Sequence, residues 1–228
     1  MWQGKNKAVT FSFDDGVLQD KRLIQILDKY GLKCTFNLNS SLLGLKNSLD
    51  RNGKRVDHSK VNPDEVKELY KNHEVAVHTL THPHLMGESE ECIAWQVEED
   101  RRALERLTGK PVVGMAYPYG DNDDRIADII KRRTGVKYAR TITSTHNFNL
   151  QENLLRFNPT VYYIEDCLFD IINEFLGQNG DKPQLLYIWG HSYEMDAEYI
   201  TWEKFEEACK LLSGRKEIFY GTNSEVLL

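Results

Sequence analysis

The chain has 228 residues, a hydrophobic fraction of 40% and a formal net charge of -6 at pH 7. This composition fits one large domain with a real core better than two small ones, and the lack of a basic stripe argues against binding to nucleic acid. No segment reaches the roughly 20 consecutive apolar residues needed to span a membrane. No signal peptide precedes the first strand, so a cytoplasmic location is expected if residue 1 is the native start. The cysteines form no C-x-x-C pair, which disfavours a zinc ribbon or a disulfide framework.

Short β-rich runs alternate with amphipathic helical stretches along the chain. The first helix shows the pattern: apolar Leu23, Ile24 and Leu27 recur at helical spacing, and Gly31 ends the run. This alternation implies βα units and a parallel sheet, closed as a barrel or open. In chain order the predicted elements are a strand at 8–13, a helix at 18–30, strands at 33–39 and 74–79 around a helix at 63–70 that Asn62 caps, a helix at 89–107, strands at 112–118 and 137–141 around a helix at 125–133, a helix at 167–176, a strand at 185–191, a helix at 202–212 and a strand at 217–220.

Reactive side chains follow five of the predicted strands. In parallel barrels and open α/β sheets, active sites gather at the carboxyl ends of the strands. The sequence therefore predicts one active site at this shared edge. The residues are Asp14 and Asp15 after the first strand, His78 at the end of the third, Tyr117 to Tyr119, Arg140 and His191 after later strands.

Asp14 and Asp15 are adjacent, and a turn or a helix N-cap is the plain reading of such a pair. Successive residues on an extended backbone point in opposite directions, however. One carboxylate can therefore bind a cation while its neighbour faces the substrate, and Gly16 supplies the tight turn beyond them.

His78 and His82 are four residues apart, a spacing that can also arise by chance. Pro83 disfavours a helix here, and Thr79 stands where the zinc-protease motif H-E-x-x-H has its glutamate. A strand end that turns into a loop can also bring both imidazoles to one metal. With Asp15 they would give the donor set of a catalytic zinc site. The same donors form the facial triad of non-haem iron oxygenases, but those sites usually occupy all-β folds.

The remaining histidines carry less information. A lone histidine at the end of an apolar strand is more often part of the core, but the position of His191 on the shared edge makes it a candidate general acid. For His58, His73 and His146, surface or structural roles are expected.

Together these residues resemble the polysaccharide deacetylase family, also called carbohydrate esterase family four or the NodB-homology domain. TFSFDDG and HTLTH match its first two motifs, AYPYG is similar to the third, and the end of LLYIWGH resembles the fifth. The resemblance implies an α/β fold with a distorted, incomplete, seven-stranded TIM-like (β/α) barrel, here as a single domain over residues 1–228. It also implies roles for individual residues. Asp14 would be the general base, Asp15, His78 and His82 the metal ligands, the backbone N–H of Tyr119 an oxyanion donor, and His191 the general acid. The metal would be divalent, with Zn²⁺ favoured over Co²⁺, Ni²⁺ or Mn²⁺.

Two departures from the family pattern lead to hypotheses. The arginine of the third motif, which orients the base, falls at Ala116, so we expect Arg140 to reach Asp14 instead. The fourth motif has no clear match, which leaves the partner of His191 open. Trp189 is expected to wall the acetyl pocket.

The favoured function is metal-dependent removal of N-acetyl groups from a carbohydrate, with O-acetyl cleavage as the same chemistry on an easier leaving group. The alternatives are a C–N hydrolase acting on a small non-carbohydrate amide and a non-catalytic metal- or glycan-binding relative. The expected partner is an acetylated oligo- or polysaccharide. A long polar connection at 40–60 should lie over the active face as a loop and shape substrate choice. The oligomeric state, the glycan and the native metal stay open.

Overall fold

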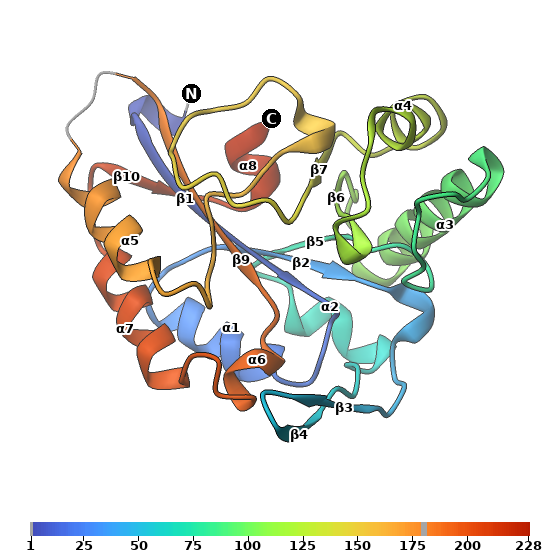
Figure 1. Cartoon of the computed structure of the whole chain (residues 1–228), viewed down its shortest axis with the longest axis horizontal. Coiled ribbons are helices and arrows are strands. Elements are labelled where there is room, and N and C mark those ends of the chain that lie inside the picture. The colour runs from blue at the N-terminus through green and yellow to red at the C-terminus, as the bar shows by residue number, and fades with distance from the viewer. Residues whose placement is uncertain (1, 179–181) are drawn as a thin grey trace.

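The computed structural model describes residues 2–178 and 182–228, and its centre is a curled parallel sheet (Figure 1). The strand order is β7-β6-β5-β2-β1-β9-β8, and β10 pairs with the first residues of β1 beside the start of β2. The bounds are β1 Lys7–Asp14, β2 Cys34–Leu38, β5 Glu74–Val77, β6 Gly114–Ala116, β7 Tyr138–Arg140, β8 Val161–Tyr162, β9 Gln184–Gly190 and β10 Ile218–Tyr220. Seven strands on one path, all parallel, confirm the predicted incomplete barrel.

The barrel is incomplete between its two edge strands, β7 and β8. The segment that joins them partly spans this opening, because Phe157 forms a parallel bridge with Arg140. Three residues later, the Thr160 N–H donates to the Tyr187 carbonyl of β9 over 2.9 Å. One connecting segment therefore bonds to both sides of the gap.

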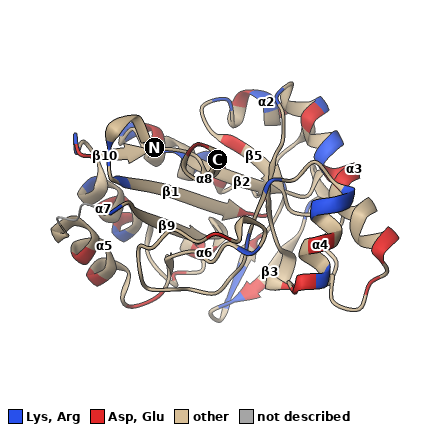
Figure 2. Cartoon of the chain, turned by 90° about the horizontal axis from the view of Figure 1, so that it is seen from above, with Lys and Arg blue, Asp and Glu red and all other residues tan. Residues whose placement is uncertain are grey.

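Helices cover the outside of the sheet, and more of the charged residues belong to these helices than to the strands (Figures 1 and 2). In β1 every residue after Lys7 is buried, as expected for a parallel strand covered on both faces. None of the helices in the described residues is long and apolar enough to cross a bilayer. The helix bounds are α1 Asp20–Lys29, α2 Val66–Leu69, α3 Glu90–Thr108, α4 Asp124–Arg133, α5 Leu168–Gly177, α6 Tyr193–Asp196, α7 Trp202–Leu212 and α8 Asn223–Leu227.

Most predicted elements are present, and local chemistry explains their ends. In α3 the Ser89 side chain accepts a hydrogen bond from the Cys92 N–H, and Gly109 ends the helix in the left-handed conformation at φ 70°. The helix predicted at 63–70 is instead a 3₁₀ turn, Pro63–Glu65, that continues into α2, and Asn62 caps it through a capping box. The short elements β8, α6 and α8 were not predicted.

The connection at 40–60 is not the irregular loop that the sequence suggested. It contains a β-hairpin of β3 (Ser48–Arg51) and β4 (Lys54–Asp57), paired antiparallel. Asn52 and Gly53 at the tip both have positive φ, 51° and 71°, the conformation that a tight hairpin turn requires. The hairpin gives this segment a defined path back toward the end of β1, where the Val61 N–H donates to the Gly16 carbonyl over 2.9 Å.

Candidate active site

The carboxyl ends of the central strands surround a cavity of about 630 Å³. β1 contributes Asp14 and, directly after it, Asp15, while β9 contributes Trp189 and the following His191. The connection at 40–60, with residues before, within and after the β3–β4 hairpin, lines another side, as predicted for a segment over the active face. The lining residues on which the chemistry depends are Asp14, Asp15, His58, Lys60, His82, Tyr119, Trp189 and His191.

Asp15, His78 and His82 form a group that could hold a metal ion. One donor atom from each lies within 4.8 Å of the others, and the Nε2 atoms of His78 and His82 are 3.9 and 3.8 Å from Asp15 Oδ1. His78 donates its Nδ1–H to the Ala116 carbonyl over 2.8 Å, which leaves its Nε2 lone pair free for a ligand. Two imidazole nitrogens and one carboxylate suit Zn²⁺ with open positions, so the residues fit the group that the sequence implied.

The protonation states favour metal binding. Burial lowers the pKa of His78, and burial together with the nearby His78 lowers the pKa of His82 to about 4. Both imidazoles are therefore neutral near pH 7, as ligands must be. Burial would raise the pKa of Asp15, but the Lys60 ammonium and a hydrogen bond from His58 hold it well below its usual range.

Four residues around the cavity have left-handed backbones that non-glycine residues rarely adopt: Asp15 (φ 82°), Thr79 (φ 65°), His82 (φ 58°) and Tyr119 (φ 56°). Such conformations cost about 1–3 kcal/mol each and persist where the surroundings hold them. Asn39 is one such restraint, because its side-chain amide donates to the Thr79 carbonyl over 2.9 Å and also to the His78 carbonyl. The HTLTH segment thus leaves its strand as a strained turn, and not as a helix.

Asp14 is buried, and both of its carboxylate oxygens have a polar partner. Arg140 forms an ion pair with Oδ2, and the Asn37 amide donates to Oδ1 over 2.8 Å. Burial would raise the pKa of Asp14, but the neighbouring Arg140 guanidinium, together with the His78 and His191 side chains, outweighs burial and lowers that pKa. The side chain is therefore a carboxylate at neutral pH.

Arg140 reaches Asp14 from the strand next to the one that carries Ala116. Ala116 of β6 is the direct neighbour of Arg140 in β7, so the guanidinium comes from one strand further along the sheet. Arg140 is fully buried, and its guanidinium carbon lies 4.4 Å from the centre of the Trp189 ring. Trp189 also stacks on Tyr162 at 4.2 Å, so the indole holds the arginine as well as lining the cavity.

His191 faces Asp14 across the cavity, with 3.9 Å between Nε2 and Asp14 Oδ2. Its other nitrogen, Nδ1, lies 3.3 Å from Glu194 Oε1, which supplies the partner that the sequence left open. Glu194 also accepts from the Tyr162 hydroxyl and from the His191 N–H at 3.1 Å. Burial alone would lower the pKa of His191, but the charge and hydrogen bond of Glu194, aided by Asp15 and Asp14, raise it to about 9.

Tyr119 lies at the rim of the cavity with its side chain about half exposed. Its ring stacks on His84 at 3.9 Å and meets the edge of His82 at 4.5 Å. The side chain therefore helps to enclose the His82 imidazole, while the left-handed backbone turns the chain at the end of AYPYG.

Sequence reasoning missed Glu194 and Asn37, and it also missed two residues that contact Asp15, His58 and Lys60. His58 Nε2 is 3.1 Å from Asp15 Oδ2, and the buried Lys60 ammonium is 3.6 Å from Asp15 Oδ1. A surface or structural role was expected for His58, and the structure places its side chain largely buried against Asp15. Only the path of the hairpin brings these residues to Asp15, so no local spacing could have linked them.

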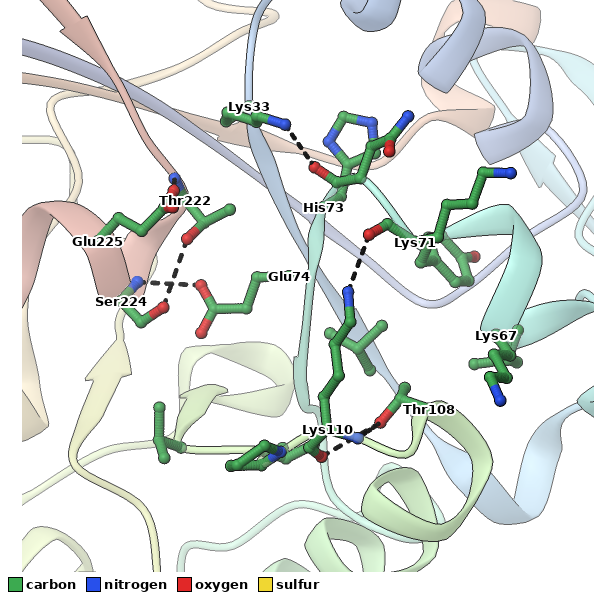
Figure 3. A pocket seen from close by; sticks show the side chains of 17 residues that line it. Lys33, Lys67, Lys71, His73, Glu74, Thr108, Lys110, Thr222, Ser224 and Glu225 are labelled. Carbon is green, nitrogen blue, oxygen red and sulfur yellow. Dashed lines mark hydrogen bonds between the residues drawn. The ribbon is translucent and has the colours of Figure 1, made fainter.

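A second hollow, of about 380 Å³, lies at the amino ends of β2, β5 and β6 (Figure 3). Two of its lysines bond to backbone carbonyls: Lys33 donates to the Asn72 carbonyl and Lys110 to the Lys71 carbonyl, both over 2.8 Å. Glu74 accepts hydrogen bonds from Thr35, Tyr138 and the Ser224 N–H. These contacts stabilise the base of the barrel, and the candidate chemistry lies at the other end.

Comparisons with known proteins agree with this fold. A family model described as Polysaccharide deacetylase matches residues 3–139. No curated protein matches the chain significantly. Among solved structures, the deacetylase PplD of Streptococcus pyogenes has a TM-score of 0.54 and 22% identity, over 64% of this chain and 61% of its own. A pseudoenzyme of carbohydrate esterase family four from Bacillus anthracis has a TM-score of 0.63 and 19% identity, over 98% of this chain and 66% of its own. A family four carbohydrate esterase from Streptomyces lividans has a TM-score of 0.59 and 16% identity, over 96% and 93%. The chain spans less than two thirds of the length of the first two, and at these identities all three similarities concern the fold.

Proposed function

The chain belongs to the polysaccharide deacetylase family, and on that premise we propose that it is a metal-dependent hydrolase that removes acetyl groups from a carbohydrate. The favoured substrate is an N-acetylated oligo- or polysaccharide, and O-acetyl esters are the alternative. One observation carries the proposal: the Asp14 carboxyl group and the His191 imidazole face each other at 3.9 Å beside the Asp15, His78 and His82 donors.

Asp15, His78 and His82 would hold the cation. When bound, a divalent cation polarises the acetyl carbonyl and makes attacking water more acidic. Zn²⁺ fits this donor set best, and Co²⁺, Ni²⁺ and Mn²⁺ are further candidates.

Asp14 accepts the proton of the attacking water. The Arg140 ion pair and the Asn37 amide fix the orientation of its carboxylate and keep it ionised, although they also make it a weaker base. A cation held by Asp15, His78 and His82 would offset that weakness, because it would make the attacking water more acidic. The backbone N–H of Tyr119, at the cavity rim, would stabilise the oxyanion that develops on the carbonyl oxygen.

His191 protonates the leaving group. An amine or a sugar alkoxide leaves poorly without a proton, and a histidine with a pKa of about 9 carries one throughout the neutral range. Glu194 keeps this proton in place and fixes the ring through Nδ1, so Nε2 is the atom that donates.

The alternatives differ in testable ways. The Bacillus anthracis relative is described as a pseudoenzyme, so membership of the fold does not by itself guarantee turnover. In this chain the base, the acid and the three donors are all present, which supports catalysis. A small non-carbohydrate amide would also fit a cavity of about 630 Å³, and this remains the second candidate.

The test is acetate release from acetylated chito-oligosaccharides and from acetylated xylan, with and without added zinc, cobalt or nickel. We expect metal-dependent release that falls about 10²-fold or more in Asp14→Asn, because general-base catalysis contributes on that order. Asp64→Asn, at an exposed position that does not line the cavity, is the matched control. No release from either polymer by a metal-loaded protein would reject carbohydrate deacetylation, and the same mixture tested on small amides would then decide for the second candidate.

A further inference from the structure

Away from the cavity, a second group of metal-binding side chains lies just beyond the end of β8. We propose that His146, Glu165 and Cys167 form a zinc site separate from the catalytic one. His146 comes from the segment that spans the opening of the barrel, and Glu165 and Cys167 lie between β8 and α5. The three donor atoms all lie within 4.8 Å of one another.

The donor atoms converge on one point. His146 Nε2 is 2.5 Å from Glu165 Oε2, and Cys167 Sγ is 4.0 Å from the same nitrogen and 3.8 Å from the same oxygen. Tetrahedral zinc with a sulfur, a nitrogen and an oxygen ligand holds such atoms roughly 3.3–3.6 Å apart. A cation would therefore need the His–Glu pair to open by less than an ångström and the sulfur to approach by a few tenths.

This arrangement differs from a catalytic cysteine triad. In a triad, the cysteine and the carboxylate bond to opposite nitrogens of the imidazole, so that the carboxylate orients the ring. Here the thiol and the carboxylate both approach Nε2 of His146. Competition of two groups for one nitrogen is unsuited to proton relay, but three donors facing a common point is what a cation requires.

The backbone holds the donors from both segments in place. Glu165 Oε1 accepts from the Ser144 hydroxyl and from the Tyr162 N–H at 2.9 Å, which leaves Oε2 to face His146. The His146 N–H donates to the Thr160 carbonyl over 2.9 Å, and its backbone is left-handed with φ 50°. A ligand carboxylate whose second oxygen is hydrogen-bonded is a recurring feature of metal sites.

The donor types indicate the ion. A thiolate sulfur, an imidazole and a carboxylate oxygen together favour Zn²⁺, whereas Mg²⁺ and Ca²⁺ prefer oxygen ligands alone. The His146 side chain is 48% exposed and that of Glu165 29% exposed, so solvent can supply a fourth ligand. A bound ion would fasten the 144–146 segment to the end of β8, next to Tyr162, whose hydroxyl reaches Glu194. Because binding displaces the thiol proton, the affinity should rise with pH.

Cobalt titration separates the two sites, because a thiolate bound to Co²⁺ gives a near-ultraviolet charge-transfer band and the catalytic donor set contains no sulfur. We expect the full-length protein to bind two equivalents, with this band accompanying one of them. Cys167→Ser should lose the band and bind one equivalent of Co²⁺ fewer. His146→Asn should lower the affinity for that equivalent tenfold or more. Cys92→Ser is the matched control, because Cys92 is also a partly exposed free cysteine.

A second measurement keeps the result independent of the proposed function. In a double variant with Asp15→Asn and His82→Asn, the band and one equivalent should remain, and Zn²⁺ should still protect Cys167 from alkylation. The proposal is overturned if cobalt gives no thiolate band, if the band survives in Cys167→Ser, or if His146→Asn binds the metal as tightly as the unchanged protein. Mg²⁺ should give no protection at the same concentration.

Discussion

Glu194 controls the charge of the proposed general acid, and Glu194→Gln is therefore the most informative single substitution. The carboxylate lies 3.3 Å from His191 Nδ1 and is the main influence that raises the pKa of this histidine against the effect of burial. A glutamine keeps the shape and one acceptor oxygen but removes the charge. The variant should fold, and the acid should lose its proton at a lower pH.

The expected loss of kcat in Glu194→Gln follows from the amount by which Glu194 raises the pKa of His191. Raising a histidine pKa from 6.5 to about 9 corresponds to roughly 3 kcal/mol of preferential stabilisation of the protonated form. Because the pKa is raised, the acid is fully present at low pH and is lost as the pH rises through about 9. With a pKa near or below 6.5 in the variant, the protonated fraction at about pH 7.5 falls from nearly all to about one tenth. We expect at least a tenfold lower kcat there and near-complete recovery at lower pH.

The assay is the pH dependence of kcat on the acetylated substrate that the enzyme prefers, with p-nitrophenyl acetate in parallel. The nitrophenolate leaves without a proton, so the variant should keep its rate on that ester. Glu198→Gln is the control, because Glu198 is exposed and pairs with Lys54. An unchanged alkaline limb, or an equal loss on both substrates, would refute the assignment of His191 as the acid.

Three further predictions test other parts of the site. Arg140→Ala should lower kcat by about 10²-fold or more, because the ion pair with Asp14 is lost. The metal content, measured by elemental analysis, should stay at the level of the unchanged protein. Full activity of the variant would disprove the idea that Arg140 replaces the arginine missing at Ala116. Lys60→Met should bind Zn²⁺ at least about tenfold more tightly in competition with a chelator, equivalent to about 1.4 kcal/mol, because the ammonium faces the ligand carboxylate; weaker binding would contradict this. Gly190→Ala should lower the free energy of unfolding by about 1–3 kcal/mol in urea titrations, because its methyl group would overlap the buried Tyr163 ring, and no change would show that the ring can move aside.

Local patterns were enough to predict much of the fold and part of the site. Short β-rich runs alternate along the chain with stretches of helical apolar spacing, and this alternation predicted the parallel sheet. Polar residues directly after the strands indicated which edge of the sheet is active. Asp14, Asp15, His78 and His82 lie within short motifs, so their grouping could be expected without knowing the chain path. The contact of Arg140 with Asp14 followed from the shared edge, and strand register explains it.

Contacts that depend on the path of a connection could not be predicted in the same way. His58 and Lys60 reach Asp15 only because the chain reverses at the β3–β4 hairpin. The Asn52-Gly53 pair between apolar Leu49 and Val56 was a usable indication of that reversal. Glu194, three residues after His191, is within one helical turn and was similarly accessible. Strand β8 has only two residues, too few for any periodicity to show.

The position of β1 has a consequence for how the molecule is made. This strand ends at Asp14 and is followed directly by Asp15, but most of its pairing is with β9, which ends at residue 190. At about 5–20 residues per second, synthesis of the intervening chain takes roughly 10–35 s, during which one edge of an apolar strand has no partner. The Thr10 hydroxyl also lacks its partner until even later, because the Asn223 side chain that accepts its hydrogen bond is synthesised after β9. A nascent chain therefore holds Asp14 and Asp15 long before it holds an active site, and it should depend on chaperones, or on slow elongation, more than its size alone would suggest.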